Sequence, residues 1–162
     1  MEEPVNRSRT SAGVTLIEML IVVTLIGLMA GISYPSVSSG VDTLRLSSAS
    51  DSLAALLNSA ANRAERRQEA VEVTISIKEN AVSVLSSGAA YTRRLEMPLG
   101  VSIYAVLPKP PGDAVDPRRF ILLPGASSPR ISVEMSNRRG ARRRVSVDPR
   151  TGVPIVERLP NS

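Results

Sequence analysis

The longest apolar stretch of the chain runs from Val14 to Ile32 and contains one charged residue, Glu18. At about 1.5 Å of rise per helical residue it would extend over roughly 28 Å, close to the thickness of the hydrocarbon core of a bilayer. The pattern therefore predicts a membrane-spanning helix over 14–34. A carboxylate facing lipid costs on the order of 3 kcal/mol, and this stretch holds no basic residue to pair with it. Glu18 consequently needs a partner from outside its own helix.

A second helical pattern follows directly. Apolar residues recur at steps of three and four with polar residues between them, which is typical of a helix that buries one face. This predicts an amphipathic helix over 35–68 that extends the first one. The expected buried positions are Val37, Val41, Leu44, Ala49, Leu53, Leu56, Leu57, Ala60 and Ala64.

The remainder of the chain shows the alternation that is typical of strands. Apolar and polar residues alternate over 70–78, which predicts a half-buried strand with Ile77 as its last core position. Glu79-Asn80 can then turn the chain into a second strand at 81–85. Further strands are expected at 91–97, 101–105, 120–123, 131–135, 144–148 and 153–156, and the Pro-rich segment 107–119 is expected to be a loop. The predicted fold class is α+β, a long N-terminal helix packed on antiparallel β-sheet.

The composition excludes several kinds of site. The chain has no cysteine and no histidine, so disulfides, thiolate metal sites and imidazole catalysis are ruled out. The carboxylates are scattered, and no serine has a base to activate it. We therefore expect no enzymatic activity, no metal site and no cofactor. Aromatic residues make up only 2% of the chain, so the core is expected to consist of aliphatic side chains.

The net charge of +5 arises in the last fifth of the chain. Basic and acidic side chains balance from Val14 to Pro129, and arginine predominates after that. Arg7 and Arg9 lie just before the apolar helix, whereas the first basic residue after it is Arg45. The positive-inside tendency therefore places the N-terminus in the cytoplasm and the C-terminal domain across the membrane.

The residues at the start of the helix resemble those of type IV pilin-like proteins. The leader MEEPVNRSRTSAG ends in Gly13, and VTLIE follows, with Glu18 at its fifth position. The resemblance implies that a prepilin peptidase/methyltransferase cuts after Gly13 and methylates the new amino terminus of Val14. It also implies that Glu18 helps to dock each subunit into a filament. Val14 is a departure, because the family usually has Phe at this position.

The rest of the chain resembles the H-class minor pseudopilins of type II secretion systems, the GspH/FimT family. The similar segments are the Ala-rich helix end before Arg67, Val71 to Ile77, Leu95 to Val101, Phe120 to Gly125 and Val145 to Val153.

This second resemblance implies a pilin-like domain organisation: a leader peptide at 1–13, a transmembrane helix at 14–34, an amphipathic extension at 35–68 and a β-rich periplasmic domain at 69–162. It further implies a single-pass inner-membrane protein with a cytoplasmic N-terminus. Such a protein would assemble with other pseudopilins into a periplasmic pseudopilus that helps to drive protein secretion across the outer membrane.

Two other interpretations of the apolar stretch remain open at this stage. It could be a plain membrane anchor in which Glu18 has no role. It could also be the core of a secretory signal peptide that is cut near Ala30.

A group of arginines near the C-terminus supports an alternative function. The group consists of Arg138, Arg139, Arg142, Arg143 and Arg144. Related minor pilins of DNA-uptake systems bind nucleic acid, and these side chains could neutralise phosphates. No aromatic residue lies after Phe120, so contact would be limited to the DNA backbone. Otherwise the group would be a solvated hairpin tip or would contact acidic neighbours in a filament.

Overall fold

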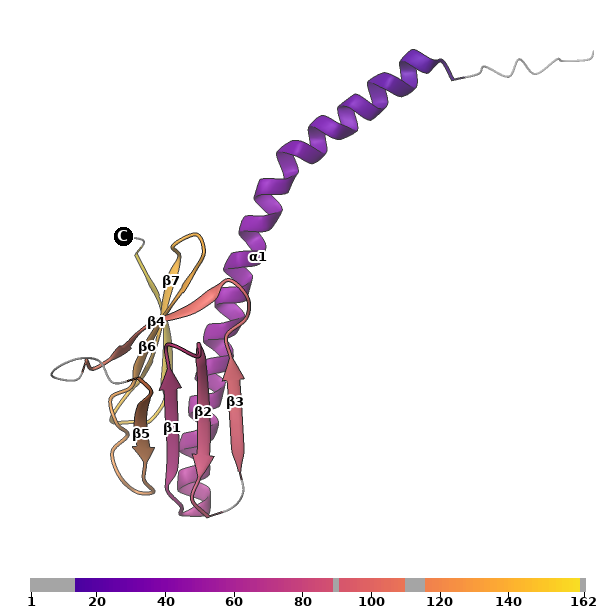
Figure 1. Cartoon of the computed structure of the whole chain (residues 1–162). Helices are drawn as coiled ribbons and strands as arrows, with labels where there is room; N and C mark the ends of the chain where they lie inside the picture. The colour runs from indigo at the N-terminus through magenta and orange to yellow at the C-terminus, as the bar shows by residue number, and fades with distance from the viewer. Residues whose placement is uncertain (1–13, 89–90, 110–115, 161–162) are drawn as a thin grey trace, which may run out of the picture. The chain divides into compact units, whose positions relative to one another are not determined.

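The computed structural model describes residues 14–88, 91–109 and 116–160, with the side chains of 33–39 excepted. The described residues form one helix followed by a series of strands (Figure 1). The elements are α1 (Leu16–Arg67), β1 (Val71–Ser76), β2 (Ala81–Ser86), β3 (Thr92–Glu96), β4 (Val101–Leu107), β5 (Arg118–Leu122), β6 (Ser132–Asn137), β7 (Arg142–Val147) and β8 (Pro154–Leu159).

The strands form two antiparallel four-stranded sheets. Their orders are β3-β2-β1-β5 and β4-β6-β7-β8. The predicted α+β class and the antiparallel pairing are thereby confirmed, and the division into two sheets is new. The predicted loop at 107–119 is shorter than expected, because β4 includes Leu107 and β5 begins at Arg118; residues 110–115 lie outside the described part.

The chain divides into two units at Ser38. In the first unit, the large apolar side chains that the structure describes on α1, up to Ile32, are all exposed, from 44% for Val22 to 83% for Leu16. No helix in the described part of the chain combines the length and hydropathy of a membrane-crossing segment.

The second unit has one core, mostly aliphatic with Phe120 at its margin, that α1 shares with both sheets. In Figure 1 the C-terminal part of α1 runs alongside β1, β2 and β3. The helix contributes a face of residues at steps of three and four: Leu46, Ala49, Leu53, Leu57, Ala60 and Ala64. The sheets contribute the valines and isoleucines of alternating positions, as the strand pattern predicted.

The N-terminal end of this buried face differs from the prediction. Ala49, Leu53, Leu57, Ala60 and Ala64 are buried as expected and Leu56 is half-buried, but Leu44 is 70% exposed and Leu46 is buried instead. Counting back three residues from Ala49 reaches Leu46, whereas Leu44 lies on the far side of the helix. Val41 is exposed as well, and the side chain of Val37 lies outside the described part.

α1 ends at Arg67 because the chain adopts a left-handed cap. Gln68 has a φ of 53°, and the N–H of Glu69 donates to the carbonyl of Ala64 at 3.4 Å. This is the hydrogen-bond pattern of a Schellman motif. The cap turns the chain directly into β1.

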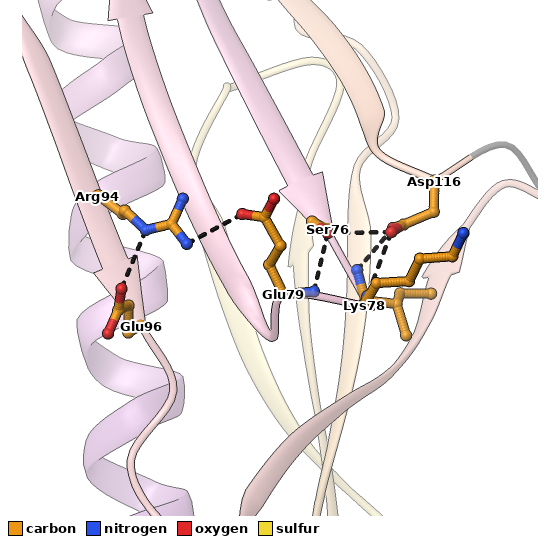
Figure 2. Close-up of polar contacts among 7 residues, drawn as sticks. Ser76, Lys78, Glu79, Arg94, Glu96 and Asp116 are labelled. Carbon is orange, nitrogen blue, oxygen red and sulfur yellow. Dashed lines mark hydrogen bonds and ion pairs between the residues drawn. The ribbon is translucent and has the colours of Figure 1, made fainter.

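The turn between β1 and β2 corrects a second prediction. β1 ends at Ser76, which is buried, and Ile77 is exposed within the turn. Figure 2 shows the reason: Asp116 accepts hydrogen bonds from the Ser76 hydroxyl, the Ile77 N–H and the Lys78 N–H, at 3.0, 2.7 and 3.3 Å. The bonds from Ile77 and Lys78 take two backbone donors that a longer strand would use.

Asn80 closes the same turn and connects the two sheets. Its φ is 52°, a conformation that asparagine tolerates better than most residues. Its side-chain Nδ2 donates to the carbonyl of Val101 and its Oδ1 accepts from the N–H of Ile103, both at 2.8 Å. The β1–β2 turn is thus tied to the start of β4.

Candidate functional site

The start of α1 is a well-formed helix cap. The Thr15 hydroxyl accepts a hydrogen bond from the N–H of Glu18 at 3.3 Å, and the Thr15 carbonyl accepts one from Met19 at 3.2 Å. Thr15 is therefore the N-cap, and Thr-x-x-Glu is the spacing of a capping box. Val14 lies exposed just before the cap, and Gly13 lies outside the described residues.

This cap places the Glu18 carboxylate in the first turn of the helix. A negative charge there is favoured by the positive end of the helix dipole. Within the described part of the chain the carboxylate itself accepts no hydrogen bond and forms no ion pair. By contrast, the Thr24 hydroxyl in the same apolar segment is satisfied by the carbonyl of Leu20 at 2.7 Å. Glu18 is thus free to interact with a cation supplied from outside the chain.

The five C-terminal arginines lie in and beside the hairpin that joins β6 to β7. Asn137 shapes this hairpin: its Oδ1 accepts hydrogen bonds from the N–H groups of Arg139 and Ala141, both at 3.0 Å. Gly140 supplies the positive φ, 80°, that the turn requires. Arg138 and Arg139 are exposed at the tip.

Strand alternation separates the other arginines. Arg142 and Arg144 lie on the outer face of the sheet, where Arg144 pairs with Glu134 at 2.6 Å and Arg142 lies 4.9 Å from the ring centre of Tyr104. Arg143 shares the opposite face with the core residue Val145.

The structure therefore does not bring the five arginines into one patch. Arg144 is partly neutralised by Glu134, and Arg139 pairs with Asp42 of α1 at 3.3 Å. Glu134 was overlooked in the sequence, although a signal was present. Glu134 and Arg144 are equally far from the hairpin turn, so an antiparallel ladder places them opposite each other.

A groove of about 270 Å³ lies between the C-terminal end of α1 and the loops that follow β5 and β7. Its lining is mostly polar and includes Asn62, Glu65, Ser128, Arg150 and Thr151. Asp148 shapes the loop that follows β7. Hydrogen bonds from the Arg150 N–H and the Thr151 hydroxyl to its carboxylate lower its pKa. No cluster of three or more metal-ligating side chains occurs among the described residues.

Comparison with known proteins connects the helix start to a family motif. Residues 8–34 match the family described as the prokaryotic N-terminal methylation motif. No curated protein sequence is significantly similar to the chain.

Among solved structures, the chain is similar to the minor pseudopilin EpsH from the type 2 secretion system of Vibrio cholerae. The TM-score is 0.52 at 11% sequence identity, and the match covers 71% of this chain and 96% of that one. The start of the chain thus carries the methylation motif, and the chain is similar in fold to this minor pseudopilin.

Proposed function

We propose that the chain is a minor pseudopilin, a structural subunit of a type II secretion pseudopilus. The observation that carries the proposal is that the methylation motif covers the start of α1, where an unpartnered carboxylate stands in the first turn of an apolar helix. The likeness to EpsH supports the secretion system over other pilin-like assemblies. The role is structural, and this chain's own residues perform no covalent step.

Processing of the leader explains how Glu18 acquires a partner. Cleavage after Gly13 gives Val14 a positive amine directly before the Thr15 cap. That charge adds to the positive end of its own helix dipole and needs an anion nearby. A neighbouring subunit, displaced along the helix axis, can supply its Glu18, and the apolar surroundings strengthen the attraction because they screen it weakly.

The exposed apolar face of the first unit supports a membrane location before assembly. Side chains such as Leu16, Ile17 and Ile26 are more than half exposed in the isolated chain, and such a surface requires lipid or other helices to cover it. We place residues 14–34 in the inner membrane as a single span, with residues 1–13 on the cytoplasmic side and the β-rich domain in the periplasm.

Mass spectrometry of the purified protein tests the proposal. After co-expression with a prepilin peptidase, the chain should lack residues 1–13 and carry one added methyl group on Val14. Gly13→Leu should keep the leader, because a bulky side chain prevents close approach of the backbone to the peptidase. Thr10→Leu is the matched control and should be cut normally. Retention of the leader in the wild-type chain, or a cut near Ala30, would overturn the assignment.

DNA binding is the less supported alternative. Arg139, Arg142 and Arg144 are engaged by Asp42, Tyr104 and Glu134, so the arginines act first as determinants of the fold. Secretion and DNA uptake can be separated by genetics: deletion of the gene should leave cargo proteins in the periplasm without reducing transformation.

A further inference from the structure

β8 forms a regular, open edge of its sheet. It lies at one end of the order β4-β6-β7-β8, with β7 as its one neighbour among the described strands. The ladder between β7 and β8 runs without a bulge from Val147↔Pro154 to Arg142↔Leu159. The opposite edge strand, β4, is interrupted by a bulge after Ile103. β8 therefore offers the backbone of a further strand a continuous edge, and this surface lies wholly within the second unit.

One backbone contact shows which groups of β8 face the open side. The N–H of Asp148, just after β7, donates to the carbonyl of Val153 at 3.1 Å. Hydrogen-bonded pairs alternate along an antiparallel ladder, so every second residue of β8 turns its backbone groups away from β7: Pro154, Val156 and Arg158. Within the described part of the chain, the N–H groups of Val156 and Arg158 have no hydrogen-bond partner. Two donors are thus available to a further strand.

The side chains along this edge carry charge that the fold does not offset. Arg158 lies opposite Arg143 in a pair without backbone hydrogen bonds, the geometry in which side chains are closest. Like charges placed in this way destabilise a sheet, and neither guanidinium group forms an ion pair among the described residues. On the same face Val156 lies opposite the core residue Val145, and on the other face Glu157 is exposed.

This order of side chains defines the segment that would complement the edge. An acid opposite Arg158 offsets the arginine pair, a base opposite Glu157 forms a cross-strand ion pair, and an aliphatic residue opposite Val156 extends the aliphatic row. Because successive residues of a strand point to opposite faces, the three are consecutive in the added strand. In an antiparallel strand their order from the N-terminus is acid, base, aliphatic.

We propose that β8 binds an extended segment of a partner protein by antiparallel strand addition, and that this segment carries the order acid, base, aliphatic. Backbone hydrogen bonds to Val156 and Arg158 supply the affinity, and the side-chain order supplies the selectivity. The charges of Glu157 and Arg158 also oppose pairing with an arbitrary apolar strand. The edge is thereby reserved for a segment of complementary charge.

Dye-labelled peptides test this pairing with the full-length protein in nonionic detergent. The complementary peptide is STEKVTV, and the matched control is STKEVTV, which has the same composition with the two charges exchanged. Fluorescence anisotropy should show that the exchange weakens binding about tenfold, because it converts two opposite-charge pairs into like-charge pairs. The difference should shrink at about 1 M salt, where the Debye length is about 3 Å.

Methylation of the peptide backbone tests the hydrogen bonds separately. In the proposed pairing, the N–H groups of the glutamate and the first valine of STEKVTV donate to β8, whereas those of the lysine and the following threonine point away. N-methylation of the first two residues should abolish binding, and N-methylation of the other two should preserve it.

A substitution in the protein tests the charge. Arg158→Gln should reduce the preference for STEKVTV over STKEVTV to about threefold, since one of the two charged pairs is lost. Arg66→Gln is the matched control and should keep the full preference, because Arg66 is exposed on α1, away from this edge.

Equal binding of the two peptides by the wild-type protein, or unchanged binding after N-methylation of the glutamate and first valine, rules out strand addition at β8. A second copy of the chain is the other possible occupant. The chain has no cysteine, so disulfide-linked dimers of Val156→Cys, together with no binding of either peptide, would assign the edge to a second copy and refute the proposal. None of these results bears on removal of the leader, which mass spectrometry measures independently.

Discussion

At the scale of single residues, Asn80 contributes more to this fold than its place in a surface turn suggests. Its amide both donates to Val101 and accepts from Ile103, so one side chain supplies a donor and an acceptor to the same strand. Aspartate retains the acceptor but places a negative oxygen against the Val101 carbonyl.

Asn80→Asp should therefore destabilise the domain by about 1–3 kcal/mol. The measurement is urea unfolding in detergent at neutral pH. Asn58→Asp, at an exposed position of α1, is the matched control and should change stability by less than about 0.5 kcal/mol. Equal effects of the two substitutions would refute the proposed bridge between the sheets.

Asp116 makes a pH-dependent contribution at the same turn. Desolvation of its carboxyl raises the pKa, but the hydrogen bonds from Ile77, Ser76 and Lys78 outweigh it, so the pKa lies below the usual value of 3.8. A group with a lowered pKa in the folded state stabilises the fold above its unfolded pKa, and the stabilisation is lost as pH falls through the folded pKa.

We expect Asp116→Asn to lower the unfolding temperature at pH 7, with a difference from wild type that shrinks below about pH 4. Thermal unfolding followed by circular dichroism measures this. Asp148→Asn is measured in parallel. The pKa of Asp148 is lowered too, so the stability of the wild-type protein depends on pH through both carboxylates. A difference that stays constant from pH 7 to pH 3 would show that the Asp116 charge is not responsible.

At the scale of secondary-structure elements, local patterns predicted most of the fold. The period of two located β1 and β2, and the period of three to four located the buried face of α1 from Ala49 onward. Both depend on residues close in sequence. The division into two sheets depends on pairings between distant segments, such as β1 with β5 and β4 with β6, which no local pattern encodes.

In the candidate site, too, local features were predictable from the sequence and contacts between distant residues were not. The Thr15 cap and the position of Glu18 follow from four consecutive residues. The grouping of the five arginines failed because proximity in sequence is not proximity in a strand: neighbouring residues of β7 point to opposite faces. Asp42, nearly a hundred residues before its partner Arg139, could be assigned only from the structure.

Two leucines of the amphipathic segment provide a test at this scale. Leu53 is fully buried and Leu44 is 70% exposed, although the sequence assigned both to one face. Leu53→Ala should cost about 2–5 kcal/mol because it leaves a cavity between α1 and the sheets. Leu44→Ala should cost less than about 0.5 kcal/mol. Similar costs in chemical denaturation would mean that the structure places the helix face wrongly.

At the scale of the whole molecule, the proposed function gives the two units separate tasks. The core lies entirely in the second unit, so substitutions in the first should affect assembly without affecting the stability of the domain. Glu18→Ala is the decisive variant, because it removes only the carboxylate that we assign to a neighbour's amine.

Glu18→Ala should still lose its leader and should unfold at the wild-type temperature, but it should no longer co-purify with the pseudopilins of the proposed assembly. Thr24→Ala in the same helix is the control, since its hydroxyl is satisfied internally, and it should co-purify normally. Intact co-purification of Glu18→Ala would leave the carboxylate without the role proposed for it.

The side chain of Asn80 has one more consequence. Asn80 occupies the carbonyl of Val101 and the N–H of Ile103 at the start of β4, which is an edge strand of its sheet, so these two groups cannot pair with a strand of another molecule. Exposed borders of this kind promote aggregation. The Asn80 side chain therefore opposes aggregation through the start of β4.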